Sequence, residues 1–146
     1  MSGETFLDSN IFIYAFDKTA VQKREFARGL IRQVLQDGTG IISYQVVQEV
    51  LNVLTRKLAV SMSAGDAARY LASTLEPLWK VQPSDALFQS GLSIRARYQY
   101  GFYDSLIIAA ALAAGCDRLY SEDLQNGQQI DGLVIENPFA WKVHER

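Results

Sequence analysis

The chain has 146 residues, enough for about one folded domain with a sizeable core. It carries 14 Lys and Arg residues against 16 Asp and Glu residues, and the resulting formal net charge of −2 does not by itself indicate a nucleic-acid-binding protein. The single cysteine, Cys116, excludes an internal disulfide and a cysteine-based zinc site, and the single histidine, His144, excludes serine–histidine or cysteine–histidine catalysis.

Short apolar runs and helical patterns alternate along the chain. The apolar runs predict strands at residues 5–8, 40–42, 78–81, 118–120 and 133–135. Apolar residues at helical spacing, several of them preceded by a capping serine, predict helices at residues 9–16, 21–35, 44–58, 63–75, 84–98 and 104–115. This alternation predicts one α/β domain with about five short strands.

The sequence carries no recognisable targeting segment. Its first ten residues have neither the basic start nor the apolar stretch of a signal peptide. The longest apolar run, residues 106–114, is much shorter than the roughly 20 residues that a membrane span needs. We therefore expect a cytoplasmic protein that does not cross a membrane.

Three acids stand at the ends of predicted elements. Asp8 ends the first strand, Asp104 begins an almost purely aliphatic helix, and Asp123 follows the strand at 118–120. In open α/β folds, ligands bind outside the carboxyl ends of the strands, so these acids can converge at one edge of the sheet. The helix that follows Asp104 has no polar face and should be buried all round. Each acid taken alone also fits the structural role of a helix cap.

A fourth acid, Glu49, lies within the predicted helix at 44–58. Gln45 and Asn52 form a polar seam beside it, and a solvated surface acid is the structural alternative for Glu49. The seam borders the apolar stripe of the helix, which consists of Val47, Val50, Leu51, Leu54 and Leu58. Glu49 is therefore expected to be half-buried, where a metal site would need it.

Carboxylates gathered in one place repel each other unless a cation compensates. Oxygen ligands without Cys or His suit Mg²⁺ or Mn²⁺, which can polarise a phosphoryl oxygen and activate a water molecule. We therefore take Asp8, Glu49, Asp104 and Asp123 as the candidate catalytic and metal-binding residues of a phosphodiester-cleaving enzyme. Glu122 stands next to Asp123, so the identity of the fourth acid is open, as is the number of metal ions.

The four acidic segments resemble, in order, the motifs of the PIN-domain family, and within it the VapC-like toxins of VapBC-type toxin–antitoxin pairs. Residues 6–11 (Phe-Leu-Asp-Ser-Asn-Ile) are similar to the opening Asp-x-Asn of the family, and residues 42–49 (Ile-Ser-Tyr-Gln-Val-Val-Gln-Glu) to its second acidic motif. Residues 102–107 (Phe-Tyr-Asp-Ser-Leu-Ile) resemble the third motif, and residues 119–124 (Leu-Tyr-Ser-Glu-Asp-Leu) resemble a Thr/Ser-x-Asp turn after a strand.

The resemblance covers almost the whole chain and implies a three-layer α/β/α sandwich with a mostly parallel sheet. It implies that the four acids bind Mg²⁺ or Mn²⁺. Asn10 and Ser121 would then support these acids without contacting the metal themselves. The implied activity is endonucleolytic cleavage of RNA by a metal-activated water. The implied partners are RNA, a cognate antitoxin protein and a second copy of the chain.

Three other functions remain as alternatives. An RNA-processing PIN nuclease without a toxin role would carry the same motifs, and an inactive PIN-like module would bind only a partner protein. An aspartyl-nucleophile phosphatase would normally have an acid two residues after Asp8, where this chain has Asn10. It would also need a lysine near the later acids, and none lies between Lys80 and Lys142.

The helices at 21–35 and 64–75 carry more apolar surface than a thin sandwich needs. Homodimerisation or antitoxin docking would bury part of it. The residues concerned are Phe26, Leu30, Tyr70 and Leu71.

Overall fold

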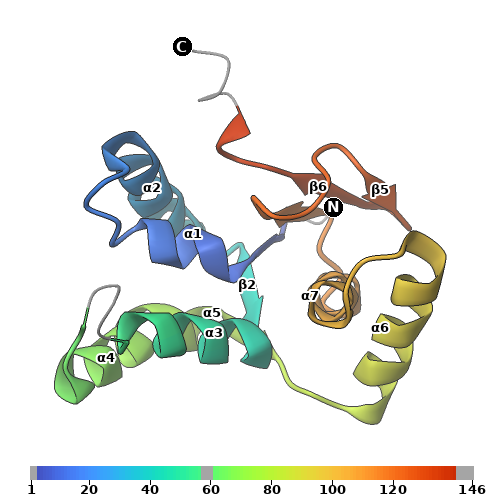
Figure 1. Cartoon of the computed structure of the whole chain (residues 1–146), viewed down its shortest axis with the longest axis horizontal. Coiled ribbons are helices and arrows are strands. Elements are labelled where there is room, and N and C mark those ends of the chain that lie inside the picture. Colours follow the sequence, from blue (N-terminus) through green and yellow to red (C-terminus); the bar gives the residue numbers. More distant parts are fainter. Residues whose placement is uncertain (1–2, 57–60, 141–146) are drawn as a thin grey trace.

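The computed structural model describes residues 3–56 and 61–140 of the chain (Figure 1). The strands are β1 (Thr5–Leu7), β2 (Gly40–Ser43), β3 (Trp79–Val81), β4 (Arg118–Tyr120), β5 (Gln129–Ile130) and β6 (Leu133–Glu136). The helices are α1 (Ser9–Tyr14), α2 (Val21–Asp37), α3 (Tyr44–Leu54), α4 (Ala64–Tyr70), the π-helical turn η1 (Leu71–Leu75), α5 (Glu76–Leu78), α6 (Asp85–Tyr98) and α7 (Phe102–Ala113). His144 and the predicted helix end at Leu58 lie outside the described residues.

The six strands form one sheet in the order β3-β2-β1-β4-β6-β5. Every neighbouring pair is parallel except β5 and β6, which are antiparallel. The chain leaves β1 toward β2 and β3 on one side and returns to place β4 on the other side. The direction of the strand order therefore switches between β1 and β4, and such a switch point opens a crevice at the carboxyl ends of the strands.

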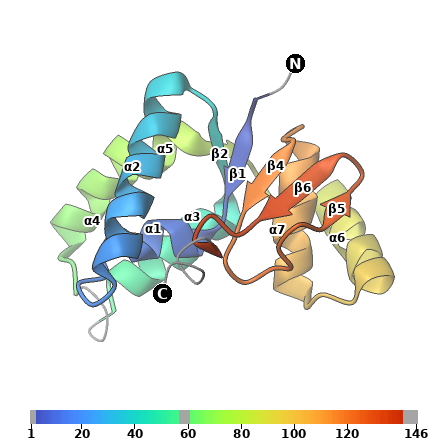
Figure 2. The same ribbon diagram turned by 90° about the horizontal axis from the view of Figure 1, so that it is seen from above.

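Helices cover both faces of the central strands. All residues of β1 and β2 are buried, which requires a covering layer on each face because side chains alternate along a strand. In Figures 1 and 2, helices α1 to α5 gather on one side of these strands, and α6 and α7 lie on the other side, below β4 and β6. The predicted α/β/α arrangement with a mostly parallel sheet is confirmed.

The two helices α6 and α7 pack closely because of a glycine at their contact. A Cβ atom added at Gly91 of α6 would lie 2.7 Å from the Leu106 side chain of α7, closer than a carbon contact allows. Helix α7 is buried along most of its length, as its aliphatic sequence predicts. This packing fixes the first turn of α7, which carries Asp104, at the edge of the sheet.

Some element bounds differ from the predicted ones. Helix α3 ends at Leu54, where the Thr55 hydroxyl donates to the Leu51 carbonyl oxygen. Helical structure after Ser63 continues to Leu78 instead of ending before Pro77, because this proline lies in the first turn of α5, where its missing N–H is not needed. The two-residue strand β5 adds a sixth strand to the five that the apolar runs indicate.

The apolar residues noted on the predicted helices at 21–35 and 64–75 are mostly used inside the molecule. Phe26, Leu30, Tyr70 and Leu71 are partly buried and pack against the core. Phe26 meets Phe139 edge to face, and Tyr70 meets Phe16 in the same way. Among the described residues, no helix is both long enough and apolar enough to cross a bilayer.

Candidate active site

Asp8 stands at the junction of β1 and α1, next to the switch point of the sheet. It caps α1, and its Oδ1 atom accepts a hydrogen bond of 2.7 Å from the Ser9 backbone amide. The residue is only 5% exposed, which is unusual for an ionisable side chain. The capping role expected for Asp8 is therefore present, but capping alone does not explain why the carboxylate is buried.

Ser121 holds the other oxygen of this carboxylate. The register of the sheet places Leu7 opposite Tyr120, so the next residues of the two strands, Asp8 and Ser121, meet beyond the strand ends. The Ser121 hydroxyl donates to Asp8 Oδ2 at 2.7 Å and is fully buried. The same hydroxyl accepts a bond of 3.2 Å from the Asp123 backbone amide, so one serine connects the two acids.

Asn10 joins the N-terminal turn to the loop that carries Asp123. Its side-chain nitrogen lies 3.2 Å from Asp123 Oδ2, and its Oδ1 atom accepts from the Glu122 backbone amide at 3.4 Å. Asn10 and Ser121 are therefore both hydrogen-bonded to candidate acids, Asn10 to Asp123 and Ser121 to Asp8 and Asp123.

All four candidate acids line one cavity. It has a volume of about 250 Å³ and lies between α1, α3, the first turn of α7 and the loop after β4. Glu49 reaches it from the second turn of α3, where Gln45 Nε2 donates to its carboxylate at 3.1 Å. Asn52, the other residue of the predicted polar seam, also lines the cavity. The fold therefore brings together all four residues that the sequence singled out.

Burial and mutual repulsion act on Asp8 and Asp104. Loss of solvent raises the pKa of Asp8 from 3.8 to about 6, against the lowering effect of its bonds to Ser121 and Ser9. The charges of the Glu49 and Asp123 carboxylates make a smaller contribution to this rise in the pKa. Burial is also the main cause of the raised pKa of Asp104, followed by the charges of Asp123 and Glu49. The cavity therefore concentrates negative charge that the described residues leave uncompensated.

The acid next to Asp123 has a different set of contacts. Glu122 Oε2 lies 2.7 Å from the Lys23 ammonium group, and its Oε1 atom accepts from the Tyr14 hydroxyl at 2.6 Å. Lys23 also lies 4.8 Å from the centre of the Tyr14 ring. Tyr14 and Lys23 lie outside the four acidic motifs of the sequence. Their contacts connect α1 and α2 to the loop after β4 and turn Glu122 away from the cavity that Asp123 lines.

These contacts predict different results for the two adjacent acids. We expect Asp123→Asn to reduce the rise in melting temperature that Mg²⁺ produces, because it removes a charge from the cavity. Glu122→Gln should leave this rise largely intact and lower the stability of the protein slightly, because an ion pair that solvent still reaches contributes little. Thermal melts of both variants with EDTA and with Mg²⁺ measure the difference. If Glu122→Gln loses the rise in melting temperature with Mg²⁺ and Asp123→Asn keeps it, then Glu122 and not Asp123 is the fourth acid of the site.

The donor set fits a hard divalent cation, but it is not a closed cage. Within residues 3–56 and 61–140, no three Asp, Glu, His or Cys side chains come together closely enough to hold a metal ion by themselves. Mg²⁺ commonly keeps several water molecules and contacts only one or two carboxylates directly. Four acids around an open cavity, two of them with raised pKa values, are compatible with such a hydrated ion.

The fold and the acidic cavity together define a protein class. The family model of the PIN domain matches residues 5–127, and the chain belongs to the PIN-domain family. The match includes both strands of the switch point and all four acids of the cavity. A comparison with curated proteins finds no match.

Solved structures with the same fold come from several bacteria. A toxin–antitoxin complex from Klebsiella pneumoniae gives a TM-score of 0.65 at 18% identity, with 92% of this chain and 98% of the other covered. VapBC2 from Rickettsia felis, bound to a DNA fragment from its promoter, gives 0.63 at 19% identity, covering 90% and 96%. VapC20 from Mycobacterium tuberculosis, a sarcin–ricin loop cleaving toxin, gives 0.58 at 16% identity, covering 81% and 88%.

Proposed function

We propose that the protein is a metal-dependent endoribonuclease that uses Asp8, Glu49, Asp104 and Asp123 to bind Mg²⁺ or Mn²⁺. The observation that carries this proposal is the single cavity lined by all four acids at the switch point of the sheet. Membership of the PIN-domain family supports it. A phosphatase with Asp8 as nucleophile is disfavoured, because the position two residues later holds Asn10 and not an acid.

Each acid has a distinct position in this proposal. Asp8 is fixed by two hydrogen bonds and offers a carboxylate of defined orientation. Asp123 is held by Asn10, while Glu49 is held by Gln45 from the opposite wall. Asp104 stands in the first turn of α7, where the helix dipole favours negative charge. A bound divalent cation would polarise a phosphoryl oxygen and lower the pKa of a water molecule.

Purified protein should cleave single-stranded RNA in the presence of Mg²⁺ or Mn²⁺ and should lose this activity in EDTA. Cleavage is followed by gel electrophoresis of an end-labelled RNA of mixed sequence. Asp104→Asn is the matched negative control, because it keeps the size of the side chain and removes its charge. Undiminished cleavage in EDTA, or by Asp104→Asn, would contradict the proposed mechanism.

We further propose that the protein is the toxin of a type II toxin–antitoxin pair, acts as a homodimer and is neutralised by a small antitoxin protein. Similarity to the toxin–antitoxin complexes from K. pneumoniae and R. felis supports this role. Expression of the wild-type chain in a bacterium should arrest growth, and expression of Asp104→Asn should not. Normal growth at equal protein levels would favour an RNA-processing nuclease instead. Failure to cleave RNA at all, with a partner protein still bound, would favour an inactive PIN-like module.

A further inference from the structure

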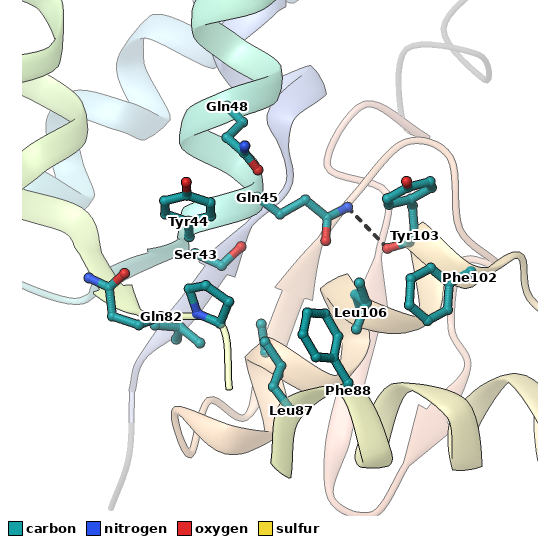
Figure 3. A pocket seen from close by; sticks show the side chains of 13 residues that line it. Ser43, Tyr44, Gln45, Gln48, Gln82, Leu87, Phe88, Phe102, Tyr103 and Leu106 are labelled. Carbon is teal, nitrogen blue, oxygen red and sulfur yellow. Dashed lines mark hydrogen bonds between the residues drawn. The ribbon is translucent and has the colours of Figure 1, made fainter. Parts of the chain in front are cut away.

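A second cavity lies beside the acidic one. It has a volume of about 350 Å³ and is enclosed by the start of α3, the segment between β3 and α6, and the start of α7 (Figure 3). Its floor is apolar and includes Leu106. Three aromatic side chains at this cavity are unusually exposed: Tyr44 at 39%, Phe88 at 42% and Tyr103 at 68%.

The two cavities are formed by the same two helices. On α7, Tyr103 lines the second cavity and the next residue, Asp104, lines the acidic one. On α3, Gln45 lines the second cavity and Glu49, one turn later, lines the acidic one. Gln45 connects the two helices, because its Nε2 atom donates to the Tyr103 carbonyl oxygen at 3.1 Å (Figure 3). The same atom also donates to Glu49 at 3.1 Å. A ligand in the acidic cavity therefore has the second cavity as its immediate neighbour.

The chemistry of the second cavity is neutral and flat-sided. None of its lining residues, all within the described part of the chain, carries a charge. Aromatic rings provide stacking surfaces, and the amide groups of Gln48 and Gln82 can donate and accept hydrogen bonds. The Gln45 side-chain oxygen can accept a further bond, because both N–H groups of this amide already donate to Glu49 and Tyr103. Unpaired RNA bases are recognised by this combination, with the base face on an aromatic ring and the base edge on polar groups.

We propose that this cavity binds one unpaired base of the RNA, next to the phosphate that is cleaved. The inference rests on the proposed ribonuclease function and adds the requirement that the substrate be single-stranded at this point. Phosphate is not the expected occupant, because the cavity offers no positive charge. The volume also lies within the range of roughly 300–1,000 Å³ that small-molecule sites occupy. A nucleotide whose phosphate lies among the acids would place its base or the adjacent base here.

The first test measures base binding without cleavage. Single-stranded RNA that contains 2-aminopurine is titrated into the full chain carrying Asp104→Asn, and fluorescence quenching reports stacking. In this background, Tyr103→Leu should weaken binding by roughly 10-fold, the usual effect of losing one stacking partner. Tyr103→Phe keeps the ring and should recover most of the lost affinity. Leu92→Ala changes an exposed apolar residue of α6 outside the lining of the cavity and serves as the matched control.

The second test uses cleavage by protein with Asp104 intact. RNA with an abasic nucleotide beside the cleavage site should be cut about 10-fold more slowly, because one stacked base is lost. Tyr103→Leu should slow cleavage of normal RNA to a similar extent. On the abasic RNA, the same substitution should cause little further slowing. Sedimentation of each variant shows whether the same residues hold two copies of the chain together.

The outcomes separate this inference from the ribonuclease proposal. If Tyr103→Leu cleaves RNA as fast as the wild type, and the wild type cleaves abasic RNA as fast as normal RNA, the base site is overturned and the ribonuclease proposal stands. If the wild type never cleaves RNA, but binding of the 2-aminopurine RNA depends on the Tyr103 ring, the ribonuclease proposal is contradicted and the base site stands. A change of mass from dimer to monomer in Tyr103→Leu would assign the cavity to a second copy of the chain and overturn the inference.

Discussion

Asp8→Asn is expected to abolish RNA cleavage and, in the absence of metal, to make the protein more stable. Asn caps a helix about as well as Asp, so α1 should keep its N-cap. The substitution removes a buried charge whose pKa the fold raises from 3.8 to about 6. At 1.36 kcal/mol per pKa unit, this corresponds to a gain on the order of 3 kcal/mol at pH 7. Cleavage should fall by orders of magnitude, because a ligand of the proposed metal is lost.

The pH dependence of stability provides the measurement for this variant. An acid with a raised pKa in the folded state binds more protons when folded, so its cost is absent below about pH 4, grows up to about pH 6 and is constant above that value. Urea unfolding of the wild type in EDTA should show this decrease, and Asp8→Asn should show a smaller one. Asp37→Asn, at an exposed helix end, should behave like the wild type. A less stable Asp8→Asn protein would show that the charge itself is needed for folding.

Ser121→Ala is expected to have the opposite effect on stability, although the two side chains touch. The serine hydroxyl is the donor to Asp8 Oδ2 and the acceptor for the Asp123 amide. Its removal leaves a buried carboxylate oxygen without this donor, which costs about 1.5–3 kcal/mol for a bond to a charged group. Both acids lose their support, so binding of Mg²⁺ should weaken about 10- to 100-fold, as is usual when a residue that orients metal ligands is lost.

A double-mutant comparison tests the physical cause of this loss. If the cost of Ser121→Ala comes from the charge on Asp8, it should shrink in the Asp8→Asn background, because the amide is neutral. Urea unfolding of the wild type, the two single variants and the double variant in EDTA gives the coupling energy. If Ser121→Ala lowers the free energy of unfolding equally in both backgrounds, the serine stabilises only the loop after β4, through its bond to the Asp123 amide.

The position of the acids could be predicted from the sequence because it depends on simple geometry. Asp8 and Ser121 each follow a strand, and parallel strands bring such residues to one edge of the sheet. The burial of α7, and with it the place of Asp104, follows from an aliphatic run without a polar face. Glu49 was expected at the border of an amphipathic helix, and it is half-buried there.

Other features depend on contacts between distant residues and could not be predicted. The choice between Glu122 and Asp123 rests on Tyr14 and Lys23, which lie about 100 residues earlier in the chain. The π-helical turn η1 leaves no clear signal in its sequence, Leu-Ala-Ser-Thr-Leu, which also suits an ordinary helix. The neutral cavity requires the starts of α3, α6 and α7 to meet, and no single segment of the sequence contains it.

Because the consecutive residues Tyr103 and Asp104 of α7 line different cavities, the protein is a suitable starting point for laboratory evolution. Tyr103 and its neighbours can be randomised without altering any of the four carboxylates. Many of these positions are exposed, so a library built there carries little risk of unfolding the chain. Variants of the proposed ribonuclease with a new sequence preference could then be selected while the proposed cleavage centre stays unchanged.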